Sequence, residues 1–342
     1  MCIRDSDDGV YPIYANALTN DGIVGYYDDY YRVKAPAVTV TGRGEVGRAR
    51  ARMIDFTPVV RLLAVRSNHD CYFLENAINN HKVVVESTGV PQLTVPQLSS
   101  YDICFPKDIV EEKKIGTYFN QLDRLITLHQ RKCEQTKKLK KYMLQKMFPQ
   151  NGADKPEIRF KGFTDAWEQR KLGEISESFE YGLNAAATEY DGKHKYIRIT
   201  DIDDSTHLFL QDDLTSPDID FSTADDYLLQ EGDVLFARTG ASVGKTYIYR
   251  RSDGDLYFAG FLIRAKIKSD YDADFVFQNT LTDSYDSYIR ITSQRSGQPG
   301  VNAQEYANFA LSVPSLAEQK KIGAYFSHLD SLITLHQRKP FC

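Results

Sequence analysis

The chain has 342 residues, of which 42% are hydrophobic, and it carries a formal net charge of −5. This length and apolar content allow two domains of ordinary size, each with its own core. No apolar run reaches the roughly 18 to 20 residues that a membrane span requires, and the first ten residues lack the charged and then apolar pattern of a secretory signal. We therefore expect a globular protein of the cytoplasm with no membrane partner.

Cysteine usage and charge distribution narrow the class further. The five cysteines are scattered, with no pair at zinc-ligand spacing, so we expect reduced thiols and no metal site. Residues 113–147 carry ten Lys or Arg against two acidic residues, a local charge of +8 that leaves −13 for the remainder. The basic segment is either a solvated helix face or a contact surface for phosphates or a partner. The acidic remainder argues against a chain that wraps nucleic acid unaided, because phosphate neutralisation supplies most non-specific affinity.

After a first domain, residues 1–108, a long helix is predicted over residues 109–148. Hydrophobic or small residues recur there in steps of three and four. This spacing is typical of a coiled-coil seam, although a plain buried helix would show it too. Apolar residues beside the seam, such as Tyr118 and Leu125, broaden this face, so the helix could contact a second surface as well.

A polar linker, residues 149–155, separates that helix from a second domain, residues 156–315. Pro149 and Pro156 flank the linker and break regular structure at both ends. Within the second domain, short strand-like runs are separated by Gly, Asp and Ser turns. The expected strands are 195–200, 233–237, 246–249 and 261–267, and the expected helices are 224–231 and 275–292.

The chain contains a tandem duplication. Residues 113–132 return as residues 320–339 with identity at 16 of 20 positions across a shift of 207, and they begin a second helical region, residues 316–342. The segment from Thr88 to Pro91 corresponds to the segment from Ser296 to Pro299 at a shift of 208. The residues between such matching segments look unrelated. A fixed scaffold that holds two diverged domains favours recognition over catalysis, because a shared catalytic task would keep its reacting side chains in both halves.

The repeat also defines the expected helix interface and the ends of the chain. Each copy begins near a Glu-x-Lys triplet, at Glu111 and Glu318, which we interpret as helix-start charges. The second copy lacks an equivalent of residues 133–148, and the first domain lacks a counterpart of the segment that starts at Pro156, so we expect a fragment truncated at both ends. The expected subunit and helix interface comprises Ile115, Phe119, Leu122 and Ile126, and then Ile322, Phe326, Leu329 and Ile333.

The segment Gly240-Ala-Ser-Val-Gly-Lys245 imitates a phosphate-binding loop. It has three residues between its first glycine and Gly-Lys where that motif needs four, and a strand-like run comes after it, so an ATPase is disfavoured. The loop is then either a plain glycine hairpin or a DNA contact, in which glycines allow the backbone to approach a duplex. The candidate DNA-binding residues are Arg238, Thr239, Gly240, Ser242 and Lys245, with Arg43 and Arg48 as candidates in the first domain.

A second candidate surface lies at residues 290–302, which mix charged and amide side chains. Arg and Gln side chains can read guanine and adenine edges respectively. Packing of this loop against the connector helix is the alternative, because its Ser/Thr-Gly-x-Pro anchor recurs in both halves. The candidate DNA-binding residues here are Arg290, Gln294, Arg295 and Asn302. The chain shows no methyltransferase motif and no helicase motif set, so no catalytic residue is predicted.

Several of these segments together resemble one family. The segment from Lys155 to Glu174, which includes Trp167, resembles the start of a target-recognition domain in specificity (S) subunits of type I restriction-modification enzymes. The repeated helical regions resemble the conserved regions of those subunits, as do the run from Gly240 to Lys245, the anchor from Ser296 to Pro299 and the run from Pro314 to Gly323. The resemblance covers most of the chain.

The resemblance implies an α+β fold in which two mixed α/β target-recognition domains are joined by long conserved helices that pair as an antiparallel coiled coil. It implies that each domain reads half of a bipartite target on double-stranded DNA. Methylation and cleavage would belong to partner modification (methyltransferase) and restriction (translocase and nuclease) subunits. S-adenosylmethionine, ATP and Mg would be bound by those partners, with no cofactor in this chain. Two alternatives stay open: a coiled-coil scaffold or adaptor with two protein-binding heads, and a silent truncated gene copy.

Overall fold

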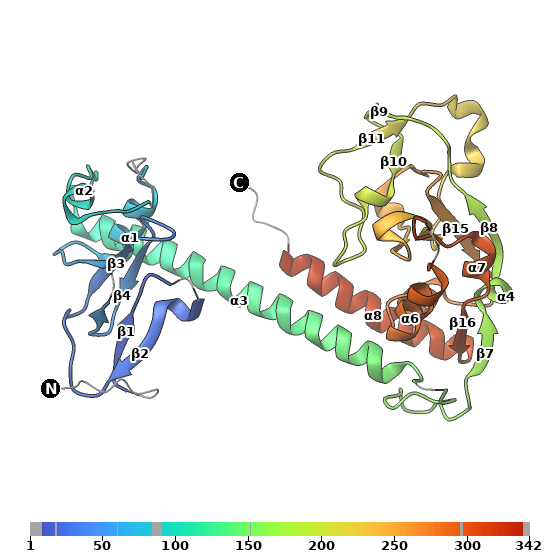
Figure 1. Cartoon of the computed structure of the whole chain (residues 1–342), viewed down its shortest axis with the longest axis horizontal. Coiled ribbons are helices and arrows are strands. Elements are labelled where there is room, and N and C mark those ends of the chain that lie inside the picture. The colour runs from blue at the N-terminus through green and yellow to red at the C-terminus, as the bar shows by residue number, and fades with distance from the viewer. Residues whose placement is uncertain are drawn as a thin grey trace. The chain divides into compact units, whose positions relative to one another are not determined.

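The computed structural model describes residues 9–17, 19–59, 61–83, 91–150, 152–294 and 297–337. The chain divides into two compact units, residues 1–128 and 129–342, so the boundary falls inside the long helix α3 (Ile109–Met147). Each unit combines strands and helices, labelled in Figure 1, and the fold is mixed α/β as expected. Within the described residues, no helix is long and apolar enough to cross a membrane.

The first unit contains two small sheets and two short helices ahead of α3. One sheet has the strand order β2-β1-β5 and the other β4-β3-β6. Strands β1 and β2, β3 and β4, and β3 and β6 pair antiparallel, whereas β1 and β5 run parallel. The elements are β1 (Tyr11–Tyr14), β2 (Ile23–Tyr27), β3 (Ala37–Thr41), β4 (Ala49–Arg52), β5 (Thr57–Pro58), β6 (Leu62–Val65), α1 (Cys71–Asn79) and α2 (Val95–Ser99), with a 3-10 turn at Thr19–Gly22.

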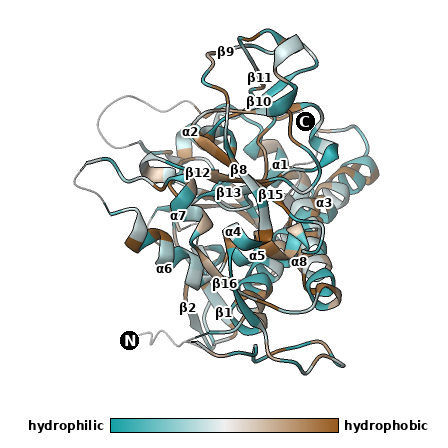
Figure 2. Ribbon diagram, turned by 90° about the vertical axis from the view of Figure 1, so that its right-hand side faces the viewer, coloured by the Kyte–Doolittle hydropathy of each residue, from teal (hydrophilic) through white to brown (hydrophobic). Residues whose placement is uncertain are grey.

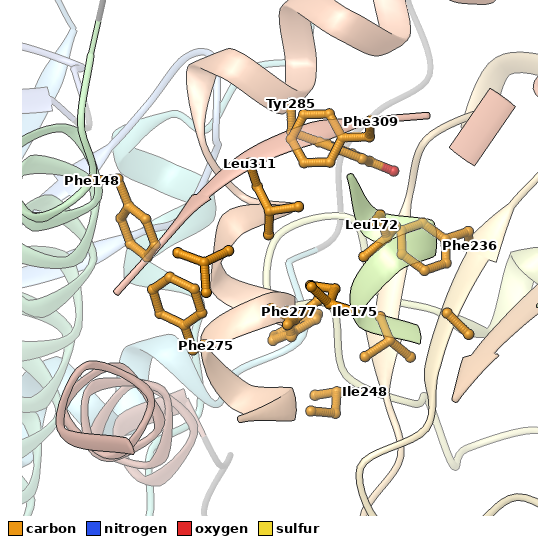
Figure 3. Packing of buried hydrophobic residues seen from close by; sticks show 14 of the residues in the cluster. Phe148, Leu172, Ile175, Phe236, Ile248, Phe275, Phe277, Tyr285, Phe309 and Leu311 are labelled. Atoms are coloured by element: carbon orange, nitrogen blue, oxygen red, sulfur yellow. The ribbon is translucent and has the colours of Figure 1, made fainter. Parts of the chain in front are cut away.

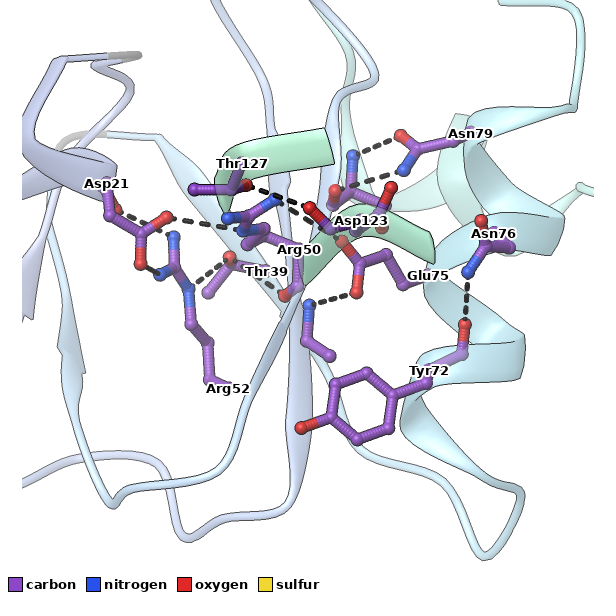
Figure 4. A network of polar contacts seen from close by, with 12 residues as sticks. Asp21, Thr39, Arg50, Arg52, Tyr72, Glu75, Asn76, Asn79, Asp123 and Thr127 are labelled. Carbon is purple, nitrogen blue, oxygen red and sulfur yellow. Dashed lines mark hydrogen bonds and ion pairs between the residues drawn. The ribbon is translucent and has the colours of Figure 1, made fainter. Parts of the chain in front are cut away.

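Strand β3 is buried along its whole length and centres the first unit. Val38 and Val40 on one face pack with Leu74 and Ile78 of α1. The other face meets a polar network, shown in Figure 4, in which Arg52 donates from Nε to Thr39 Oγ1 at 3.1 Å. A strand covered on both faces fixes its register, because a slip by one residue would exchange the apolar and polar faces.

The second unit contains a four-stranded antiparallel sheet of order β13-β12-β15-β8, with smaller pairings around it. Strand β16 pairs antiparallel with β7, β11 pairs antiparallel with β9, and β10 pairs parallel with β14. The strands are β7 (Glu168–Lys171), β8 (Ser176–Tyr181), β9 (Ala187–Glu189), β10 (Lys195–Ile197), β11 (Thr215–Pro217), β12 (Val234–Ala237), β13 (Thr246–Ile248), β14 (Leu256–Phe258), β15 (Leu262–Ile267) and β16 (Ala310–Val313). The helices are α4 (Leu172–Ile175), α5 (Ala273–Asn279), α6 (Asp283–Thr292), α7 (Ala303–Ala307) and α8 (Leu316–Gln337).

The strands expected in this unit correspond to β10, β12, β13 and β15, but the two expected helices differ from the structure. Residues 224–231 hold only a 3-10 turn, Asp225–Tyr227, after which Leu229 N–H bonds to Leu256 O at 2.9 Å. Pairing with a neighbouring strand thus overrides local helix propensity. Residues 275–292 form two helices instead of one, because the Thr282 side chain caps the start of α6.

Figure 1 shows α8 alongside the last part of α3, and the contacts establish an antiparallel pair. Lys140 Nζ lies 2.6 Å from Asp330 Oδ1, and the rings of Phe148 and Phe326 are 5.8 Å apart. Nearer the other end of the pair, His129 Nδ1 lies 3.0 Å from His336 Nδ1. Because these two histidines are equivalent across the shift of 207, the pair has an approximate local twofold axis between them. The expected antiparallel pairing is therefore present in this unit.

The main core of the second unit joins this helix pair to the sheet. Trp167, only 4% exposed, contacts Phe148 and Phe275, with ring centroids 6.2 and 5.7 Å away. Figure 3 shows Phe148 and Phe275 in the same cluster as Phe236 of the sheet. Trp167 thus packs where the domain meets α3, and this core fixes the four-stranded sheet to the helix.

Candidate nucleic-acid interface

In the second unit, the two candidate DNA-contact segments lie against each other. The hairpin loop between β12 and β13 meets the loop before α7 through an antiparallel bridge between Thr239 and Gly300. Gly240 N–H donates to Pro299 O at 3.0 Å, and Val301 N–H donates to Arg238 O at 2.9 Å. Segments about 60 residues apart in sequence therefore form one continuous surface.

The first unit repeats this arrangement. Arg43 forms an antiparallel bridge with Gln92, and Leu93 N–H donates to Gly42 O at 3.0 Å. Strand pairing supports the equivalence, since Thr41 pairs with Leu62 of β6 as Ala237 pairs with Leu262 of β15. The duplication thus extends into the parts of the domains whose sequences look unrelated. We call each hairpin with its facing loop the hairpin platform, residues 41–48 with 91–93 and residues 237–245 with 297–302.

One glycine in each hairpin platform has a structural role. Gly244 has φ +86°, and a Cβ there would lie 2.6 Å from the Ile289 side chain. Gly47 also has φ +86°, and a Cβ there would overlap Val83. A left-handed backbone with no space for a side chain requires glycine, so these two glycines maintain the hairpin shape.

The backbone after the glycines excludes the phosphate-loop alternative. Residues Gly240–Ser242 form a 3-10 turn, and strand β13 comes next where a phosphate-binding loop would lead into a helix. Lys245 Nζ donates to Ile202 O at 3.0 Å and forms an ion pair with Asp204. Its side chain is only 12% exposed. Lys245 therefore links the hairpin loop to the segment around Ile202 and Asp204. We leave it out of the proposed contact set.

Arg238, Thr239, Gly240 and Ser242 are half-buried at the rim of the platform. The Arg238 guanidinium lies over the Tyr181 ring, 5.0 Å from its centroid, and Nη1 lies 3.4 Å from Gly260 O. The ring and the carbonyl orient the guanidinium, and the residue as a whole stays partly exposed. Such an oriented donor is suited to a phosphate or a base edge.

The candidates around α6 and α7 differ in environment. Arg290 and Gln294 are exposed, whereas Arg295 lies outside the described residues. Asn302 is the N-cap of α7, where its Oδ1 accepts from Glu305 N–H at 2.9 Å. This cap gives Asn302 a structural role, so we also leave it out of the contact set.

In the first unit, Arg43 and Arg48 are exposed, and β4 adds arginines that the sequence analysis missed. Arg48, Arg50 and Arg52 alternate along the chain and line one cleft of about 380 Å³. Arg52 is buried against Asp21, while the Arg50 side chain is 53% exposed near Asp21 and Glu75 (Figure 4). The period-2 spacing of arginines could have signalled this cleft, because alternate residues of a strand share a face.

A larger groove of about 990 Å³ in the second unit has mixed charge. Lys137, Lys141 and Arg290 line it. Acidic side chains, including Asp283 and Asp286, line it as well. Five Lys or Arg side chains face four Asp side chains in this lining, so the groove has only a small net positive charge. Among the described residues, no group of three or more His, Cys, Asp or Glu side chains could hold a metal ion.

The expected helix-interface residues have different surroundings in the two copies. The second set is buried: Phe326 is 0% exposed and Ile333 6%. Their equivalents Phe119 and Ile126 are 41% and 44% exposed, and Ile115 and Leu122 are half-buried. Ile322 and Leu329 also belong to the main core of the second unit. The first copy of the seam therefore presents an apolar face.

The Glu-x-Lys glutamates are not equivalent in the structure either. Glu318 is 1% exposed and receives two hydrogen bonds from Arg159, at 2.7 and 2.8 Å, whereas Glu111 is exposed. The interpretation of Glu318 as a helix-start charge is incomplete, because it forms a buried ion pair. In both copies the next residue anchors a domain: Glu112 accepts from Asp70 N–H and Gln319 Oε1 accepts from Asp272 N–H.

Comparisons with known proteins agree on one family. The family model described as "Type I restriction modification DNA specificity domain" matches residues 4–138 and 164–340. A putative type I specificity subunit from Mycoplasma pneumoniae is 29% identical over 98 residues. That match spans 28% of this chain and 27% of the relative, so the chain aligns with about a quarter of it.

One solved structure is similar at the level of the fold, and a second was matched at a lower TM-score. The S subunit of a type I restriction-modification system from M. genitalium superposes with a TM-score of 0.67 and 15% identity, covering 97% of this chain and 85% of that one. A chain from a structure that addresses complex assembly and conformational transition of a type I restriction-modification system gives a TM-score of 0.47, also at 15% identity, covering 98% and 88%.

Proposed function

Because the chain belongs to the type I restriction modification DNA specificity family, we propose that it is the DNA sequence-specificity subunit of a type I restriction-modification enzyme. Each unit would read one half of a bipartite target through its hairpin platform. The observation that carries the proposal is the repetition of this platform in both units, with the same backbone bridges and different side chains. A shared frame with different donors is what recognition of two unlike half-sites requires.

The proposed contact set contains side chains that are at least partly open to solvent. In the second unit it consists of Arg238, Thr239 and Ser242 on the platform, with Arg290 and Gln294 on α6. In the first unit it consists of Arg43 and Arg48, with the exposed Arg50 beside them. Arginine guanidinium groups contact phosphates and read guanine edges, and glutamine reads adenine. Together they supply positioning and base contacts in each half.

In this proposal the chain itself performs no catalysis. Methylation and cleavage belong to partner modification and restriction subunits, which also bind S-adenosylmethionine, ATP and Mg, and the assembly acts in the cytoplasm. The apolar face of α3 supports partner binding: Tyr118, Leu125 and Leu128 are 58%, 51% and 53% exposed and adjoin the exposed part of the seam. Apolar side chains of this size at a helix surface mark protein contact sites.

The test is sequencing of methylated sites in DNA from cells that express the chain with a modification subunit, beside cells that express the modification subunit alone. A bipartite methylated motif that depends on the chain is the expected result. A verified complex that methylates no motif would refute the proposal.

The adaptor alternative predicts a different outcome. A scaffold with two protein-binding heads should form complexes without any sequence-selective DNA binding. An Arg238→Ala variant separates the two, because loss of a platform donor should weaken DNA binding and leave protein assembly unchanged. The matched control is Lys193→Ala, which removes an exposed positive charge of the second unit away from the platform residues.

A further inference from the structure

Matching backbone hydrogen bonds precede β6 and β15 and lie beside the hairpin platforms. Leu62 N–H donates to Val59 O at 3.3 Å in the first unit, and Leu262 N–H donates to Ala259 O at 2.8 Å in the second. Because Leu62 and Leu262 hold the same register against β3 and β12, the residues just before them are equivalent. Those residues are Arg61 and Phe261, and neither stood out in the sequence.

Phe261 combines an exposed ring with a fixed backbone. Its side chain is 62% exposed, among the highest values for a large apolar residue in the described chain. Its carbonyl accepts from Arg238 N–H at 3.0 Å, and the preceding Gly260 N–H donates to Leu183 O at 2.6 Å. An aromatic ring exposed on a loop that is tied down on both sides is held ready for contact, because little backbone entropy remains to be lost on binding.

Arg61 is exposed at the same position and has an unusual backbone. Its φ is +65°, in the left-handed region that residues other than glycine seldom adopt. Its Nη1 donates to Gln92 Oε1 at 2.6 Å, which orients the guanidinium beside the Arg43–Gln92 bridge. Backbone strain of this kind concentrates at functional sites.

We propose that Arg61 and Phe261 are specificity-determining residues that enter the DNA at equivalent places in the two half-sites. This inference rests on the proposed function. Arg61 would donate hydrogen bonds to a base edge, with guanine as the best acceptor. Phe261 would insert as an apolar wedge at a base step, as exposed aromatic side chains of DNA-bending proteins do.

Charge beside each residue favours DNA as the occupant of these positions. Arg238 lies next to Phe261 through the backbone bond between them, and Arg43 lies next to Arg61 through Gln92. A guanidinium at each position can neutralise the phosphate that flanks the contacted base. Because Phe261 offers an aromatic ring to one half-site and Arg61 offers a guanidinium to the other, the two platforms would have different base preferences.

The experiment repeats the methylated-site sequencing with the chain and its modification subunit, using Phe261→Ala and Arg61→Gly. Glycine at position 61 removes the side chain and relieves the backbone strain, so this variant should fold. Each variant should relax one position of one half-site, with discrimination there reduced about 5- to 150-fold, the range for a base contact. The other half-site should stay unchanged. Leu208→Ala and Val24→Ala, which truncate other exposed apolar residues in the two units, are the matched controls.

A second measurement tests the wedge directly. This measurement requires the wild-type motif and the half-site that Phe261→Ala relaxes. The base analogue 2-aminopurine is placed at each step of that half-site in turn. Its fluorescence should increase at one step when the wild-type chain binds, and should not increase there with Phe261→Ala. If both variants keep the complete wild-type motif, the inference is wrong while the proposed function stands. If the wild-type chain directs no methylation, the proposed function itself has failed.

Discussion

Phe119 and Phe326 occupy the same position in the two copies of the repeat, and replacing each with alanine should have unequal effects. Phe326 is 0% exposed and its ring lies 5.8 Å from Phe148 and 5.3 Å from Tyr325. Truncating such a residue removes its transfer free energy and leaves a cavity, so the free energy of unfolding should fall by about 3–5 kcal/mol. Phe119 is 41% exposed. Its loss should cost only about 1–2 kcal/mol, because part of the transfer term of roughly 1.5–3 kcal/mol applies and solvent fills the space.

The assay is urea-induced unfolding followed by fluorescence of Trp167, the single tryptophan of the chain. This residue is buried beside Phe148 and Phe275, so its emission reports the second unit. Hydrogen exchange of α1 amides reports the first unit. Phe326→Ala should lower the midpoint of the tryptophan transition, and Phe119→Ala should leave it unchanged while weakening assembly with a modification subunit. Equal destabilisation by the two substitutions would refute the argument that burial distinguishes the two copies.

Three further predictions use the same unfolding assays. Arg159→Ala should destabilise the second unit by about 3–5 kcal/mol, because it leaves the Glu318 carboxylate buried without its partner. Replacing both residues with apolar ones should cost much less. A double variant as unstable as Arg159→Ala would contradict this explanation. Gly116→Ala and Gly323→Ala each place a Cβ inside 3.0 Å of an aspartate that caps a domain helix. Overpacking should lower the free energy of unfolding by about 1–3 kcal/mol, which outweighs the gain of up to about 1 kcal/mol in helix propensity. A variant that is more stable than the wild type would contradict the close contact. Although burial opposes it, hydrogen bonds from Thr206 and Ser205 lower the pKa of Asp203 from 3.8 to about 2. Since the pKa of Asp203 is lower in the folded state, this carboxylate stabilises the fold above its unfolded-state pKa, and the stabilisation should disappear as pH falls from about 4 to 2. Asp203→Asn should abolish that part of the pH dependence of the free energy of unfolding. Identical pH profiles for the wild type and Asp203→Asn would contradict this role of Asp203.

The sequence predicted the helical scaffold, because helix periodicity is encoded locally. Residues 109–147 have apolar spacing of three and four, and the structure places them in one helix. The glycines of the hairpin platforms were also visible, since a turn that requires positive φ selects glycine at a fixed place in the sequence. The resemblance of the repeated helical regions to a known family implied the antiparallel helix pair, whose equivalent histidines meet at its local axis.

Local signals failed where tertiary contacts decide the outcome. Residues 224–231 have a helical composition but pair with β14 through Leu229. Lys245 was a candidate DNA contact, and its contacts with Ile202 and Asp204, in a loop about 40 residues earlier, were not visible in the sequence. Neither partner is near in sequence, so no local pattern could have assigned them.

The sequence by itself determined that two diverged domains share a repeated helical frame, because helix periodicity and turn chemistry depend on residues a few positions apart. Only the tertiary structure decided which side chains come together in each hairpin platform. Backbone pairing brings Arg238 beside Val301 and Phe261 beside Arg238, and the corresponding register in the first unit puts Arg61 beside Gln92. Such proximity depends on strand pairing between segments tens of residues apart, which local periodicity does not encode.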